Sequence, residues 1–89
     1  MPAKKSSRAV FTKLDDGTGV LLNLDTLRYY SLNRTGAALW QQIESSETFD
    51  SDDLLRATCQ RFDIDERRAR REIDAFVEQL QHYKMVGPA

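Results

Sequence analysis

The chain has 89 residues, 40% of them hydrophobic, which suits one domain with a modest core and leaves no room for a catalytic cleft between two domains. Thirteen basic and fourteen acidic side chains give a net charge of −1, so no overall field draws the protein to nucleic acid or anionic lipid. Cys59 is the one cysteine, which excludes an internal disulfide and a cysteine-based zinc site and fits a reducing cytosol.

The first eight residues are polar and basic. No apolar stretch follows them that has the length of a signal peptide or a membrane span. We therefore expect a disordered N-terminal arm over residues 1–8, a folded domain over residues 9–87, no contact with a membrane and a cytoplasmic location.

Three strands are predicted next, from short apolar and β-branched runs separated by turn residues. The predicted strands cover residues 9–14, 20–24 and 27–32. In the third strand, alternation places Tyr30 and Leu32 on one side and Tyr29 and Ser31 on the other, so that Tyr30 points to the core if Leu32 does.

Three helices follow, because each of three segments begins with a capping residue and continues with apolar residues at helical spacing. The predicted caps are Asn33, then Asp50 or Ser51, then Asp65. The predicted inward residues are Gly36, Leu39, Trp40 and Ile43; Leu54, Leu55, Thr58, Cys59 and Phe62; and Ala69, Ile73, Phe76, Val77, Leu80 and Tyr83 or Lys84. Gly87 and Pro88 are expected to end the last helix. The fold class is α+β, a three-stranded antiparallel sheet followed by three helices, and the short turn between the last two helices suggests a helix-turn-helix.

No residue pattern indicates catalysis. His82 stands alone near a helix C-terminus, where the dipole favours it as a surface residue. Cys59 falls on an apolar stripe, so a buried, inert thiol is expected. The acidic residues fall at caps and on exposed faces, and none of them pairs as acid and base. The sequence predicts no enzyme, no metal site and no cofactor.

Several runs of the chain resemble the PqqD-like family, the precursor-peptide recognition elements of ribosomally made, modified peptides (RiPPs). These runs are Gly19–Asp25, Arg28–Asn33, Thr35–Ala37 and Leu39–Trp40, and the likeness continues through Phe62–Asp65, Ile73–Phe76, Leu80 and Met85–Gly87. It covers about residues 9–87. The chain departs from the family pattern at Leu27, where glycine is frequent, so that a positive φ there would strain the leucine.

The resemblance implies a winged helix-turn-helix fold without catalysis, which binds the leader segment of a precursor peptide and hands it to a modifying enzyme or a protease. It further implies that the leader adds as an antiparallel strand to the third strand, in a groove against the last helix. The residues implied on the strand are Leu27, Arg28, Tyr29, Tyr30, Ser31 and Leu32. Those implied on the helix are Arg70, Arg71, Asp74, Val77, Glu78 and Gln81.

Two kinds of partner fit this interpretation, the leader protease of a lasso-peptide system and a radical SAM enzyme of the kind that matures PQQ. We expect a stand-alone module that is a monomer or a weak dimer formed through the open strand edge.

The alternative is a winged-helix DNA-binding protein. Arg67, Arg68, Arg70 and Arg71 cluster at the start of the last helix, the position of a recognition helix. A salt-bridged, solvated helix face would give the same pattern, because Glu66 and Glu72 are interleaved with the arginines. The acidic isoelectric point of about 5.7 and the absence of a basic segment between the strands disfavour nucleic acid.

Overall fold

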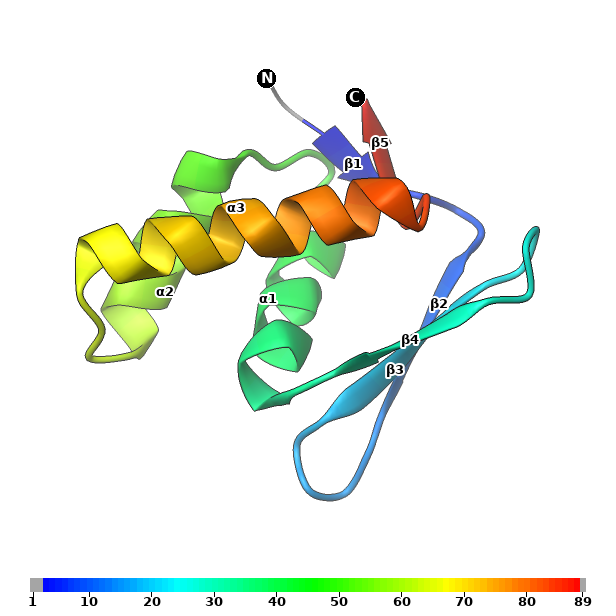
Figure 1. The fold of residues 1–89 in the computed structure, drawn as a ribbon, viewed down its shortest axis with the longest axis horizontal. Coiled ribbons are helices and arrows are strands. Elements are labelled where there is room, and N and C mark those ends of the chain that lie inside the picture. Colours follow the sequence, from blue (N-terminus) through cyan, green and yellow to red (C-terminus); the bar gives the residue numbers. More distant parts are fainter. Residues whose placement is uncertain (1–2, 89) are drawn as a thin grey trace.

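A computed structural model describes residues 3–88 of the chain and places four strands before three helices, with a short strand last (Figure 1). The elements are β1 (Ala3–Lys5), β2 (Ala9–Lys13), β3 (Gly19–Asn23), β4 (Tyr29–Leu32), α1 (Arg34–Glu44), α2 (Ser51–Arg61), α3 (Glu66–His82) and β5 (Val86–Pro88). The α+β class with a three-stranded sheet ahead of three helices is confirmed.

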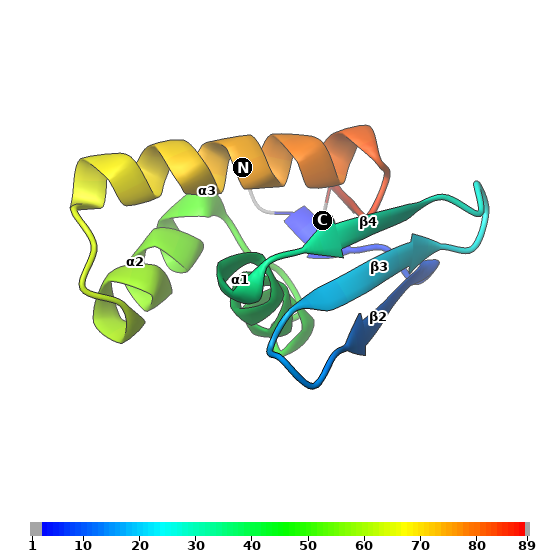
Figure 2. The same ribbon diagram turned by 60° about the horizontal axis from the view of Figure 1, so that its bottom comes forward.

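The antiparallel sheet β2-β3-β4, here called the wing, extends to one side of the helices (Figure 1). Its pleat separates two faces. Leu21, fully buried, pairs with half-buried Tyr30 on the face toward the core, whereas Leu22 pairs with exposed Tyr29 on the outer face. Figure 2 shows that β4 is the wing strand nearest to α3.

The turn between β3 and β4 is longer than predicted, and β4 begins at Tyr29 instead of Leu27. Leu27 and Arg28 therefore belong to the turn. The N–H of Leu27 donates to the carbonyl of Asn23 at 2.8 Å, and Leu27 has φ +58°. The turn thus adopts the left-handed conformation that glycine favours, at a steric cost to a leucine.

Residues 3–5 form a strand, which corrects the expected disordered arm. β1 pairs antiparallel with β5, and the backbone of Ala3 also exchanges hydrogen bonds with Phe49. Ala3 is only 7% exposed. Pairing between the two ends of a chain is non-local and leaves no periodic signal in the sequence. Residues 1 and 2 of the expected arm lie outside the described residues.

The predicted helix caps are confirmed. The side chain of Asn33 accepts a hydrogen bond from the N–H of Gly36, that of Asp50 from Asp53, and that of Asp65 from Arg68. Asp50, not Ser51, is the cap of α2, and it forms a reciprocal capping box with Asp53. These bonds satisfy backbone donors that a helix start leaves free.

The core lies where the three helices meet the inner face of the wing. Its largest fully buried side chains are Trp40, Leu21, Ile43, Leu54, Ile73, Leu80 and Met85. The inward stripe of α2 is narrower than predicted, because Cys59 is exposed and Phe62 is 37% exposed. Cys59 lies about 100° around the helix from Thr58, past the edge of the buried stripe. Phe62 has extended backbone angles, and the helix ends before it.

Candidate functional site

A groove of about 670 Å³ separates β4 and the start of α1 from one face of α3. It is called the strand–helix groove below. Its lining residues are Tyr30, Asn33, Thr35, Gly36, Leu39, Asp63, Ile64, Arg68, Glu72, Ala75, Phe76 and Gln79. β4 contributes Tyr30 to this lining, and α3 supplies the opposite side.

A free strand edge lies beside this groove. β4 pairs only with β3 among the described strands, so its other edge offers backbone groups for pairing. The N–H of Asn23 donates to the carbonyl of Arg28 at 2.9 Å, which makes these two a hydrogen-bonded pair. Because such pairs alternate in an antiparallel ladder, Tyr30 and Leu32 bond inward to β3. The N–H and C=O groups of Tyr29 and Ser31 therefore point outward.

The side chains of the predicted strand residues divide between three places. Tyr30 lines the groove, and Leu32 is buried in the core at 5% exposure. Leu27 and Tyr29 are 73% and 71% exposed, and the side chain of Tyr29 lies on the face of the wing away from the groove. For Tyr29 the backbone, and not the ring, faces the open edge.

The helical wall of the groove is a different face of α3 from the one predicted. Arg68, Glu72, Ala75, Phe76 and Gln79 form it. The six helix residues predicted to contact the peptide are absent from the lining of this groove: Arg70, Arg71, Asp74, Val77, Glu78 and Gln81.

The position of the core stripe on α3 explains why the sequence did not identify this wall of the groove. Ala69, Ile73 and Leu80 face the core and form one stripe along α3. Because each residue is turned by about 100° from the one before it, the residues beside this stripe lie on two flanks, one on each side. Only the packing of α3 over β4 decides which flank faces the strand. On the other flank, Arg70 bonds to Asp52 of α2 at 3.0 Å.

The groove has an apolar floor and a charged rim. Tyr30, Ile64 and Phe76 are partly buried hydrophobic residues packed against the core, and they supply apolar surface. On the rim, Arg68 Nε lies 3.2 Å from Glu72 Oε1. A floor that accepts apolar side chains beside fixed charges suits an extended peptide with one or two large apolar residues.

Phe76 was predicted to face inward, but its place in the groove was missed. The pattern of α3 alone gives no signal for this place, because Phe76 and Val77 extend the apolar stripe on opposite edges.

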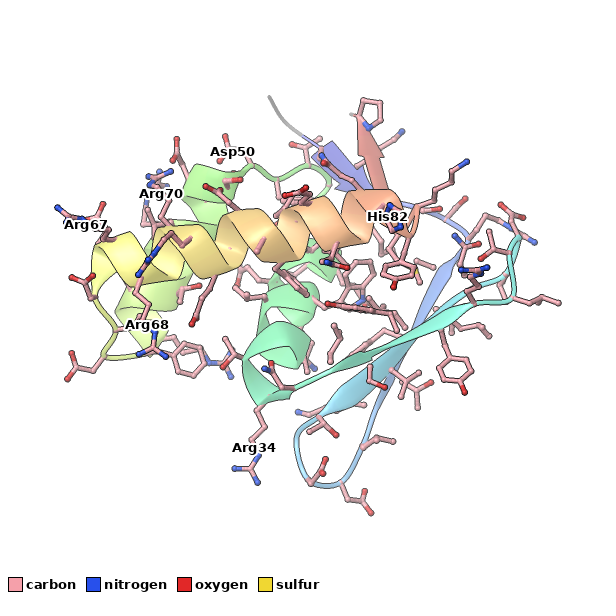
Figure 3. The ribbon with its side chains drawn as sticks, in the orientation of Figure 1. Arg34, Asp50, Arg67, Arg68, Arg70 and His82 are labelled. Atoms are coloured by element: carbon pink, nitrogen blue, oxygen red, sulfur yellow. The ribbon has the colours of Figure 1, made fainter. Side chains whose placement is uncertain are left out.

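The arginine cluster at the start of α3 is partly neutralised. Arg68 and Arg70 project to opposite sides of the helix (Figure 3), and each pairs with a carboxylate, Glu72 and Asp52 respectively. The arginines are therefore spread over two sides of α3, and Arg68 forms the ion pair with Glu72 that the salt-bridged interpretation expects. His82, at the other end of α3, is exposed as predicted.

Within residues 3–88, no group of three or more His, Cys, Asp or Glu side chains is placed to hold a metal ion. None of the helices in that range is long and apolar enough to cross a membrane.

Comparison with known proteins gives one family and two solved structures. The sequence model of the family described as coenzyme PQQ synthesis protein D matches residues 18–86. The fold is similar to TbiB1 in complex with the TbiA(β) leader peptide, with a TM-score of 0.82 and 24% identity over 93% of each chain. It is also similar to lasso peptide synthetase B1 complexed with the leader peptide, with a TM-score of 0.78 and 23% identity over 97% of this chain and 98% of that chain. No curated protein sequence matches the chain.

Proposed function

Since this chain belongs to the PqqD family, we propose that it binds the leader segment of a ribosomally made precursor peptide and catalyses no reaction itself. The leader pairs with the open edge of β4 and lies in the strand–helix groove. The observation that carries this proposal is the free β4 edge beside a groove with an apolar floor. The two proteins of similar fold, both complexed with leader peptides, support it.

Backbone pairing alone is too weak for a useful affinity. Tyr29 and Ser31 together offer two N–H and two C=O groups, and each hydrogen bond contributes about 0.5–1.5 kcal/mol net. Micromolar binding requires about 8 kcal/mol, and the peptide must also become ordered. The strand edge therefore sets the direction of the peptide, and other contacts must supply the rest of the affinity.

Apolar side chains of the leader supply that remainder. Burying a side chain of Leu or Phe size contributes about 1.5–3 kcal/mol, so at least two must be buried in the groove for micromolar binding. The charges of Arg68 and Glu72 on the rim favour one register of the bound peptide. The proposed contacts are the backbones of Tyr29 and Ser31 and the side chains of Tyr30, Leu39, Ile64, Arg68, Glu72, Phe76 and Gln79.

The bound leader is delivered to a separate enzyme. A leader protease of a lasso-peptide system and a radical SAM enzyme of the PQQ kind are the two partners predicted. The monomer or weak dimer and the cytoplasmic location stay predictions as well.

Titration of the purified chain with synthetic leader peptides encoded beside its gene tests the proposal. We expect binding, with amide shift changes at residues 29–32 and at residues 68, 72, 75, 76 and 79, and no binding of a scrambled leader. A second titration with duplex DNA at increasing salt is the control, because affinity for DNA falls steeply with salt. Absence of binding to any leader, or tight and salt-sensitive binding to DNA, would contradict the proposal.

A further inference from the structure

Asn23, the last residue of β3, is a buried polar side chain with long-range partners. It is 2% exposed. Thr58, the other buried polar residue among those described, bonds within its own helix to the carbonyl of Leu54 at 2.7 Å. The Asn23 carboxamide instead joins two turns that are far apart in the sequence.

All hydrogen-bonding positions of this carboxamide are used. Its Oδ1 accepts from the N–H groups of Asp25 at 2.8 Å and Thr26 at 3.2 Å, in the turn between β3 and β4. Its Nδ2 donates to the carbonyls of Tyr83 at 3.0 Å and Lys84 at 3.3 Å, just after α3. A carboxamide has two donor hydrogens and two acceptor lone pairs, so the side chain is fully satisfied and neither a carboxylate nor an aliphatic group can replace it.

The two turns that Asn23 joins are both conformationally strained. Leu27 and Lys84 each have φ +58°, and they are the only non-glycine residues with positive φ in the described part of the chain. At the end of α3, Met85 N–H donates to the carbonyl of Leu80 and Lys84 N–H to that of Gln81, the pattern of a Schellman motif. Strained residues persist where their surroundings hold them, and here Asn23 bonds both turns at once.

We infer that Asn23 is a positioning residue for peptide binding, which sets the distance between the wing and the C-terminal end of α3. This inference rests on the proposed function. The peptide lies between β4 and α3, and Asn23 holds the turn that leads into β4 against the end of α3. Asn23 is absent from the groove lining, so it acts on the ligand only through the width and rigidity of the groove. When the groove already has the width that the peptide requires, binding does not have to order the wing and the helix, and the affinity is higher.

Asn23→Asp tests this inference, with Thr58→Val as the matched control. The aspartate can still accept hydrogen bonds from the N–H groups of Asp25 and Thr26. Its second oxygen faces the carbonyls of Tyr83 and Lys84, and repulsion between these oxygens separates the two turns. Thr58→Val also loses one buried polar group, at a place away from the wing. We expect the leader affinity of Asn23→Asp to be at least about tenfold below that of Thr58→Val, through faster dissociation, when both are folded.

Hydrogen exchange distinguishes a local effect on the two turns from a general loss of stability. In Asn23→Asp we expect faster exchange at the amides of Leu27 and Met85, with no matching change in α1, whereas global destabilisation would speed exchange everywhere. If Asn23→Asp fails to fold, the pair is repeated in a Lys84→Gly background, where glycine relieves the positive φ. Lys84→Gly alone is expected to keep the wild-type affinity.

The outcomes separate the inference from the proposed function. Wild-type binding with a selective loss in Asn23→Asp supports both. Wild-type binding with equal affinities for Asn23→Asp and Thr58→Val overturns the inference alone, and so does a uniform rise in exchange. A wild-type chain that binds no leader overturns the proposed function and the inference with it.

Discussion

The ring of Tyr30 on β4 lies 5.2 Å, between centroids, from the ring of Tyr83 at the C-cap of α3, tilted by 34°. This contact joins the strand and the helix that form the two walls of the groove. Tyr30 therefore has two roles, because it lines the groove and also holds the wing against the last helix. Its neighbour Tyr29 makes neither contact.

Alanine in place of Tyr30 is expected to weaken both folding and leader binding. Loss of a partly buried aromatic side chain and of its ring contact should cost about 2–3 kcal/mol of unfolding free energy, less than for a fully buried ring. Tyr29→Ala, at a side chain that is 71% exposed, should change the stability by about 0.5 kcal/mol or less. Urea unfolding of both variants checks this, and equal losses would contradict the placement of the two rings.

Proline at Ser31 is expected to abolish leader binding without unfolding the chain. It removes an outward N–H on the edge strand, where proline is tolerated. Tyr30→Pro should unfold the protein instead, because the N–H of Tyr30 bonds to β3. Circular dichroism establishes folding and calorimetry measures binding, with Ser31→Ala as the control that keeps the N–H. A Ser31→Pro variant that is folded and binds normally would argue against strand addition.

Phe76 and Val77 are adjacent, half-buried residues on different flanks of α3, and they make a matched pair. Phe76→Ala removes apolar surface from the groove and should weaken leader binding about tenfold or more, roughly 1.4 kcal/mol. Val77→Ala should lower stability and leave the affinity within about threefold of wild type. Calorimetric titration of each folded variant measures the difference. The reverse order of affinities would restore the originally predicted helical wall.

Glycine in place of Leu27 is expected to stabilise the fold. Leu27 has φ +58° and a side chain that is 73% exposed, so glycine relieves the backbone and gives up little packing. The gain should be about 0.5–1 kcal/mol, since the greater freedom of glycine in the unfolded chain offsets part of the relief. Leu24→Gly, in the same turn at a residue without positive φ, should instead be destabilising. Thermal unfolding of both variants checks the sign.

Local sequence signals determined the three helices of this protein and the presence of the three wing strands. Asn33, Asp50 and Asp65 begin the three helices because each side chain bonds to a backbone N–H within three residues, an interaction that needs no tertiary partner. The inward residues of α1 are buried as their spacing predicts. The resemblance to the PqqD family likewise depended on short runs of residues, and the family match over residues 18–86 confirms it.

Only the tertiary structure decided which surfaces meet. The pairing of β1 with β5, the exposure of Cys59 and the flank of α3 that faces β4 all depend on contacts between residues far apart in the sequence. Periodicity identifies the buried stripe of a helix, but the two flanks of that stripe are equivalent until a neighbouring element covers one of them. Packing against β4, held by Tyr30, Tyr83 and Asn23, removes that equivalence and places Phe76 in the groove.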